Sequence, residues 1–239
     1  MSRFPLPAHR LACLLLPALL ALSACAAWSG GSRPTRMPAI PTEVSNAEWE
    51  KDMQRFAAED ASHPPPKHAV LFVGSSSIRM WESLARDFPD ATVINRGFGG
   101  SEIRDSTWYA PRIVLPYQPA TVVLYAGDND IASGRTPRQL HDDFVAFAEL
   151  LHRKLPKTRL VYISTKPSPS RAHLLDAQRE ANALIKAEAA RRNFVYVDVF
   201  TPMLDANGKP REELFLADRL HMNAAGYALW RELLDPYVN

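Results

Sequence analysis

The sequence predicts an α/β protein: a single three-layer α/β/α domain on a mostly parallel sheet of about five strands. Five short runs rich in β-branched and aromatic residues recur along the chain, and segments of helical periodicity separate them. Alternation of this kind produces a parallel sheet covered by helices on both faces. The expected strands are residues 69–73, 92–95, 121–125, 160–164 and 194–199.

The first residues are typical of an export signal. Arg3 and Arg10 precede residues 11–24, an almost wholly apolar stretch that is too short to span a bilayer comfortably. The stretch ends in Leu-Ser-Ala and is followed by Cys25, which resembles the lipobox of bacterial lipoproteins. This resemblance implies that residues 1–24 are a lipoprotein signal peptide and that acylated Cys25 anchors the exported protein in a membrane. The alternative is an ordinary signal peptide with a chance cysteine after its cleavage site.

Processing at this site would change both the cysteine count and the charge. Of the two cysteines, Cys13 would be removed, so neither a disulfide nor a cysteine metal site is expected. Loss of Arg3 and Arg10 brings the 28 Lys and Arg to balance the 26 Asp and Glu, so nucleic acid is not an expected partner. Ala26 rather than Asp follows the cysteine, which in lipoproteins implies the outer membrane, here its periplasmic face.

Residues 25–44 are rich in Pro, Ser, Gly and Ala and are expected to form a flexible tether, so the folded domain is expected over residues 45–239. A capping box from Ser45 to Glu48 is expected to open the first helix. Core packing is the expected role of Trp49 and Trp108. Further helices are expected over residues 78–88, after the Thr136 cap, around residues 174–189 and from Asn223 onward.

Four groups of glycine and polar residues mark the candidate site, and the first three directly follow expected strands. They are Gly74-Ser75-Ser76-Ser77, residues 95–101, residues 126–130 and residues 218–223. The carboxyl ends of the strands in a doubly wound sheet line one crevice, so these groups can meet in space.

The residue types in these groups have complementary chemistry. A serine hydroxyl needs a base to accept its proton, and His221 is the natural candidate, with Asp218 placed to fix the imidazole tautomer. The backbone N–H of Gly100 and the side-chain amide of Asn129 can bind an oxyanion. Each group taken alone also fits a plainer role: the serines as a helix cap, His221 as a surface residue, and Asn129 and the glycines as turn residues.

In this order, the four groups closely resemble the blocks of the SGNH (GDSL-type) hydrolases, a family of esterases and lipases with a flavodoxin-like fold. Gly74 aligns with the glycine of the family's Gly-Asp-Ser-Leu motif, which implies that Ser76 is the nucleophile, and Trp81 supports this register. The resemblance further implies a catalytic triad of Ser76, Asp218 and His221. It implies an oxyanion hole formed by Ser76, Gly100 and Asn129.

The nucleophile motif departs from the family pattern at two positions. Ser75 stands in place of Asp, and Ser77 stands in place of Leu or Ile. A Gly-Ser-Ser-Ser-Ile variant occurs in one branch of the family, which resembles the platelet-activating-factor acetylhydrolase-like members. Because three serines are adjacent, alignment rather than chemistry selects Ser76 as the nucleophile.

The resemblance implies a cofactor-free serine esterase whose substrate is a short-chain or acetyl ester of a glycan, a lipid or a small molecule. No Gly-Lys-Ser/Thr follows Gly74, which disfavours a phosphate-binding loop, and the sequence contains no His-Glu-x-x-His, so no metal is expected. Asp128 and Asp130 are expected to be structural. Two alternatives stay open: a catalytically silent envelope module that binds glycan or protein, and an acyltransferase on the same scaffold.

Overall fold

The computed structural model describes residues 41–238, so the expected signal peptide and Cys25 lie outside the described residues. Within this range, five strands form one sheet in the order β2-β1-β3-β4-β5, and every neighbouring pair is parallel. The fold class and the five-stranded sheet are thereby confirmed. The strands are β1 (Val70–Gly74), β2 (Val93–Gly97), β3 (Thr121–Tyr125), β4 (Arg159–Ile163) and β5 (Val195–Val197).

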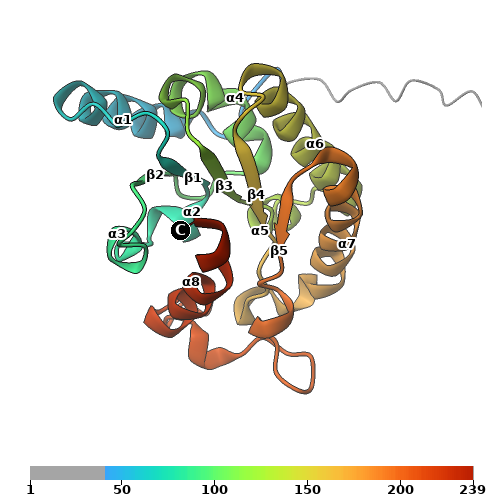
Figure 1. Cartoon of the computed structure of the whole chain (residues 1–239). Coiled ribbons are helices and arrows are strands. Elements are labelled where there is room, and N and C mark those ends of the chain that lie inside the picture. Colours follow the sequence, from blue (N-terminus) through green and yellow to red (C-terminus); the bar gives the residue numbers. More distant parts are fainter. Residues whose placement is uncertain (1–40, 239) are drawn as a thin grey trace, which may run out of the picture. The chain divides into compact units, whose positions relative to one another are not determined.

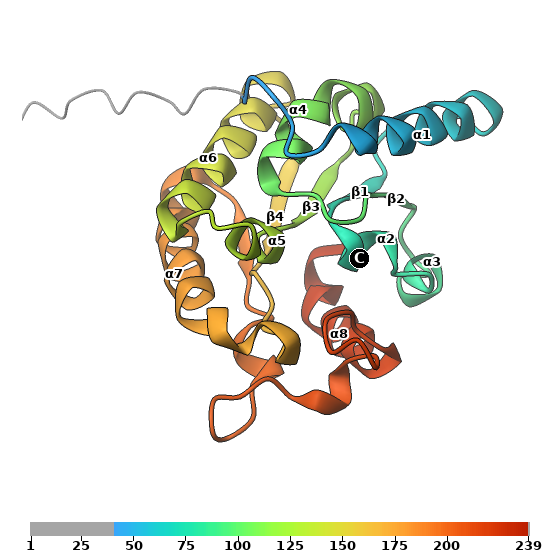
Figure 2. The same ribbon diagram turned by 180° about the vertical axis from the view of Figure 1, so that it is seen from behind.

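Helices cover both faces of this sheet (Figures 1 and 2). One apolar cluster joins the sheet to α1, α4, α6 and α7, and a second joins its other face to α2, α3 and α8. The helices are α1 (Glu50–Ser62), α2 (Ser76–Arg79), α3 (Leu84–Asp87), α4 (Ile103–Ile113), α5 (Asp128–Ala132), α6 (Pro137–Lys154), α7 (Leu175–Arg192) and α8 (Ala224–Val238).

The central strand β1 is apolar along its length because both of its faces are buried. In β1, Leu71 and Val73 point into the cluster on the α6 side, whereas Val70 and Phe72 point into the cluster on the α8 side. Successive side chains of a strand alternate between the two faces, so a strand between two helical layers needs apolar residues at every position. This requirement explains why the strands were visible in the sequence.

The expected capping box at Ser45 is wrong in detail. Asn46 is the residue whose side chain caps the first turn, where it accepts the N–H of Glu48. Ser45 instead donates both its N–H and its hydroxyl to the carboxylate of Asp105 in α4, at 2.7 and 2.8 Å. A contact across 60 residues therefore replaces the local one, and it ties the start of the domain to α4.

Residues 78–88 form two short helices, α2 and α3, rather than one. The chain turns between them so that Trp81 is buried against Phe72 and Tyr227, with ring centroids 5.8 and 5.2 Å apart. Aromatic packing against the sheet and α8 thus outweighs continuation of the helix.

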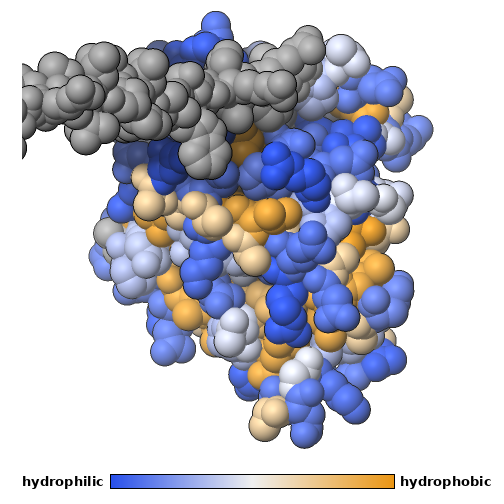
Figure 3. Space-filling model, turned by 90° about the vertical axis from the view of Figure 1, so that its right-hand side faces the viewer, coloured by the Kyte–Doolittle hydropathy of each residue, from blue (hydrophilic) through white to orange (hydrophobic). Residues whose placement is uncertain are grey.

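The α4 helix was not expected, and the core role expected for Trp108 within it is wrong. Trp108 is 41% exposed, whereas Trp49 is buried as expected. None of the described helices is long and apolar enough to cross a membrane. Figure 3 shows the side of the molecule that lies at the right of Figure 1, where α7 is. Hydrophilic side chains predominate on this side, and apolar ones are interspersed among them.

Candidate active site

The turn after β1 distinguishes among the three adjacent serines. Gly74 has φ +134°, and a Cβ there would lie 1.7 Å from the carbonyl oxygen of Tyr125, so only glycine fits where the chain leaves the sheet. Ser75 and Ser77 are 0% and 2% exposed, whereas Ser76, the first residue of α2, is partly exposed. Only the Ser76 hydroxyl of these three is open to a substrate.

Ser76, His221 and Asp218 form a chain of hydrogen bonds. The Oγ atom of Ser76 lies 3.0 Å from Nε2 of His221, and Nδ1 of the same ring lies 2.6 Å from Oδ2 of Asp218. A carboxylate at Nδ1 favours the tautomer with the proton on that nitrogen, which leaves Nε2 free to accept the serine proton. The hydrogen bond from the His221 ring, with the backbone N–H groups of His221 and Leu220, lowers the pKa of Asp218 to about 2.

The loop that carries His221 is held in place by hydrogen bonds from several directions. Oδ1 of Asp218 accepts the N–H groups of Leu220 and His221 at 3.0 and 2.9 Å, which closes a turn on the carboxylate. The buried ammonium of Lys166 donates to the carbonyl of Leu220 at 3.0 Å. The imidazole is therefore positioned before any substrate arrives.

Gly100 and Asn129, the expected oxyanion donors, lie at the mouths of two further strands, β2 and β3. Gly100 has φ +85°, a conformation that favours glycine, and its N–H donates to no backbone carbonyl among the described residues. The indole N–H of Trp49 binds the carbonyl of Gly99 at 2.9 Å and so fixes this turn. Asn129 donates one N–H of its amide to the carbonyl of Ser101 at 3.1 Å, and the second N–H is left for a ligand.

A buried charge network behind Asn129 escaped sequence reasoning. Arg171 donates to Oδ1 of Asn129 at 3.0 Å and to Oδ2 of Asp128 at 3.1 Å, and Lys166 donates to the same Asp128 oxygen at 3.1 Å. Burial alone would raise the pKa of Asp128, but the two cations outweigh it and the pKa is lowered. Lys166 and Arg171 follow β4 at the same sheet edge as the other groups, and that position was the available signal.

Asp130 has the structural role expected of it. It is buried and accepts the N–H of Ile103 at the start of α4, at 3.0 Å. Among the described residues, no group of three or more His, Cys, Asp or Glu is placed to hold a metal ion.

A pocket of about 440 Å³ brings the candidate residues to one surface. Ser76, Gly100, Asn129 and His221 all line it, and Asp218 lies behind His221. The other lining residues are Asp52, Arg79, Gly99, Arg171 and Leu220. The pocket opens at the carboxyl ends of β1 and β3, which are neighbours in the sheet and the usual place for a ligand in a doubly wound fold.

A hydrogen-bonded Ser, His and Asp at the edge of an α/β sheet is the arrangement of serine hydrolases. The model of the GDSL-like Lipase/Acylhydrolase family matches residues 58–229, and the chain belongs to this family. The resemblance seen in the sequence is thus confirmed at the level of the family.

Solved structures agree with this assignment, although no curated protein sequence matches the chain. A Streptococcus pneumonia protein named as a platelet activating factor is 21% identical, with a TM-score of 0.72 over 80% of this chain and 93% of its own. A Bacteroides fragilis protein assigned as an acylhydrolase is 25% identical, with a TM-score of 0.69 over 78% and 95%. A GDSL-like lipase from Bacteroides thetaiotaomicron is 24% identical, with a TM-score of 0.67 over 78% and 96%.

Proposed function

We propose that this protein is a serine esterase that hydrolyses carboxylic esters with Ser76 as nucleophile, His221 as general base and acid, and Asp218 as the group that orients His221. The observation that carries the proposal is the hydrogen-bonded chain Ser76–His221–Asp218, whose serine faces an open pocket. Both distances already lie within hydrogen-bond reach, as proton transfer requires.

In the first half of the reaction, Nε2 of His221 takes the proton of Ser76 while Oγ attacks the ester carbonyl carbon. The carbonyl oxygen becomes an oxyanion, which accepts hydrogen bonds from the N–H groups of Ser76 and Gly100 and from the amide of Asn129. Ser76 is the first residue of α2, so its N–H has no acceptor within the helix. Collapse of the intermediate breaks the bond to the alcohol, and His221 returns the proton to the leaving oxygen.

In the second half, His221 takes a proton from water, and the resulting nucleophile attacks the acyl-Ser76 ester. The same donors hold the second oxyanion, and the bond to Ser76 Oγ then breaks. His221 returns the proton to Oγ, the acid departs, and the enzyme is restored. Asp218 stays ionised throughout because its pKa is about 2.

The lining of the pocket favours a short acyl group and a polar alcohol. Among the described residues that line it, Leu220 alone has an aliphatic side chain. The glycines have none, and the others are polar or charged: Asp52, Ser76, Arg79, Asn129, Arg171 and His221. A long acyl chain would gain little by leaving water for such a surface, since the gain scales with the apolar area buried. Short-chain or acetyl esters of a glycan, a lipid or a small molecule are therefore the proposed substrates.

The proposed location is the bacterial envelope, through a lipid on Cys25. This part of the proposal rests on residues 1–25 of the sequence alone, which lie outside the described residues. Labelling with a radioactive or clickable fatty acid in a bacterial host, with Cys25→Ser beside the wild type, tests it. Loss of label and release from the membrane in the variant are expected, and a variant that still carries label would overturn the anchor.

The function is tested by hydrolysis of p-nitrophenyl acetate, butyrate and octanoate by the full chain. Ser76→Ala is expected to reduce turnover to background, and the buried neighbour Ser77→Ala is the matched control. Acetate or butyrate is expected to react faster than octanoate. An active Ser76→Ala variant would refute the nucleophile assignment. An inert wild type that also fails to react with a fluorophosphonate probe would favour the binding-module alternative, and ester products formed with an added alcohol would favour the acyltransferase.

A further inference from the structure

Arg79 stands at the edge of the candidate active site without an acidic partner. It ends the short helix α2 that begins with Ser76, so the two side chains lie one turn apart on the same face. Its guanidinium lies against Gly99, where a Cβ would come within 2.8 Å of Nε. The absence of a side chain at Gly99 thus makes room for this cation directly beside Gly100.

The other charges of the pocket are already compensated. Asp52 pairs with Arg55 at 3.0 Å, and Arg171 pairs with Asp128 at 3.1 Å. The guanidinium of Arg79 forms no hydrogen bond or ion pair in the part of the chain that the structure describes, and only its backbone N–H is bonded, to the carbonyl of Ser75. It leaves the pocket with one exposed and unneutralised positive charge.

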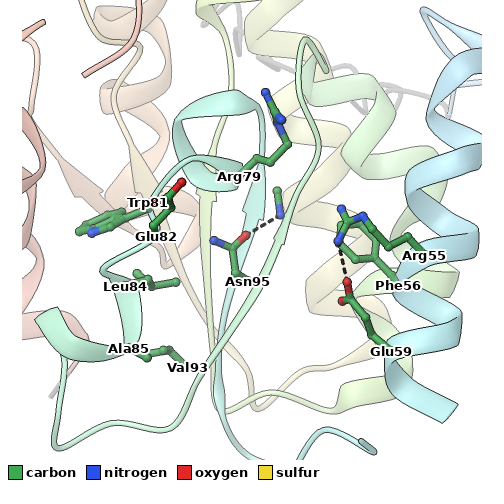
Figure 4. A pocket seen from close by; sticks show the side chains of 11 residues that line it. Arg55, Phe56, Glu59, Arg79, Trp81, Glu82, Leu84, Ala85, Val93 and Asn95 are labelled. Carbon is green, nitrogen blue, oxygen red and sulfur yellow. Dashed lines mark hydrogen bonds and ion pairs between the residues drawn. The ribbon is translucent and has the colours of Figure 1, made fainter. Parts of the chain in front are cut away.

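Arg79 also lines a second pocket, of about 370 Å³, that adjoins the first (Figure 4). In Figure 4, Arg55 and Glu59 of α1 bind each other on one wall, while Arg79 projects from α2 away from Trp81 and Glu82. The apolar lining residues of this second pocket are Phe56, Trp81, Leu84, Ala85 and Val93. Arg79 therefore lies at the junction of the two pockets and lines both.

The direction from Ser76 to Arg79 is the direction available to the acyl part of an ester. The leaving alcohol must lie near His221, because this residue protonates it. No residue of the loop 218–223 lines the second pocket, so Arg79 marks the end of the site that points away from His221. A group attached to the acyl carbon can extend toward Arg79 while the alcohol stays at His221.

We propose that Arg79 binds a carboxylate on the acyl part of the substrate, so that the preferred esters are half-esters of short dicarboxylic acids. This inference rests on the proposed esterase function. A guanidinium presents its N–H donors in a fork that matches the two oxygens of a carboxylate, and charge-assisted pairs of this kind are stronger than neutral hydrogen bonds.

The test compares acyl chains of equal length with and without a terminal charge: mono-p-nitrophenyl adipate against p-nitrophenyl hexanoate, with spontaneous hydrolysis subtracted. The wild type is expected to show a kcat/KM about tenfold higher for the adipate. Arg79→Gln is expected to lose this preference, so that its kcat/KM values for the adipate and the hexanoate agree within about twofold. Arg138→Gln, an exposed arginine of α6 that lines neither pocket, is the matched control and is expected to keep the preference.

Two results would overturn the inference: a wild type with no preference for the adipate, or an Arg79→Gln variant that loses both rates equally. Titration calorimetry with adipate, which is the acid product, separates this inference from the esterase proposal because it needs no turnover. The wild type is expected to bind adipate about tenfold more tightly than Arg79→Gln. Equal binding by the two proteins would overturn the role of Arg79 even if neither hydrolysed an ester.

Discussion

Replacement of Arg171 by Met is expected to impair catalysis through Asn129, which Arg171 itself orients. The guanidinium holds Oδ1 of Asn129 at 3.0 Å, so the amide presents its N–H groups to Ser101 and to the pocket. A hydrogen bond from a charged donor contributes about 1.5–3 kcal/mol, and the neutral bond to Ser101 that would remain contributes about 1 kcal/mol. Without Arg171, the amide is expected to spend part of its time rotated, with its oxygen toward the oxyanion.

The expected size of this effect follows from the cost of losing the donor altogether. Removal of one oxyanion donor lowers kcat by about 10²–10³, and this is the loss expected for Asn129→Ala. Because the Ser101 bond remains in Arg171→Met, we expect a loss of about tenfold in kcat with KM changed less than about twofold. A tenfold effect corresponds to a coupling of about 1.4 kcal/mol between the two residues.

The assay is a double-mutant cycle on p-nitrophenyl acetate with Arg171→Met, Asn129→Ala and the double variant. Arg138→Met, an exposed arginine of α6, is the surface control and should match the wild type. The double variant is expected to be no slower than Asn129→Ala. If Arg171→Met lowers kcat by the same factor in both backgrounds, Arg171 does not act through the amide. An unchanged kcat in the single variant would also refute the reasoning.

Two further predictions concern the turn after β1 and the pH dependence. Gly74→Ala should lower the free energy of unfolding, measured by urea denaturation, by about 2–5 kcal/mol, because its Cβ would meet the Tyr125 carbonyl. Gly208→Ala, at φ +74° in open space, should cost only about 1–2 kcal/mol, and equal costs for the two variants would contradict this. The pKa of Asp218 is lowered to about 2, so this carboxylate stays ionised until pH falls toward that value and should add no proton to the acid-side fall of kcat/KM. A fall with a slope of two well above that pH would show that Asp218 titrates there.

Much of the fold was predictable because its signals are local. The runs 70–74 and 122–125 carry no charged residue and are buried at every position, since both faces of the sheet are covered, and a central parallel strand needs that pattern. The exceptions have non-local causes. The turn within residues 78–88 is set by the burial of Trp81, and the start of the first helix is altered because Ser45 binds Asp105.

The candidate site was predictable in its residue types and in its order along the chain. The Gly, Ser and Asn groups follow strands, whose carboxyl ends parallel topology brings together, whereas Asp218 and His221 precede the last helix. The sequence left the choice among Ser75, Ser76 and Ser77 to alignment, because no periodicity tells which hydroxyl faces His221. In the structure, two of the three are buried and one is within reach of the imidazole.

By itself, the sequence determined the layered α/β architecture, the family and the set of residues from which a site can be built. Only the tertiary structure decided how the charges in that site are paired. Arg171 binds Asn129 and Asp128, which precede it by 42 and 43 positions, whereas Arg79 lies beside Gly99 with no acid in contact. The physical reason is that hydrophobic periodicity reports which face of an element is buried, whereas an ion pair depends on where two long side chains end after distant segments have packed.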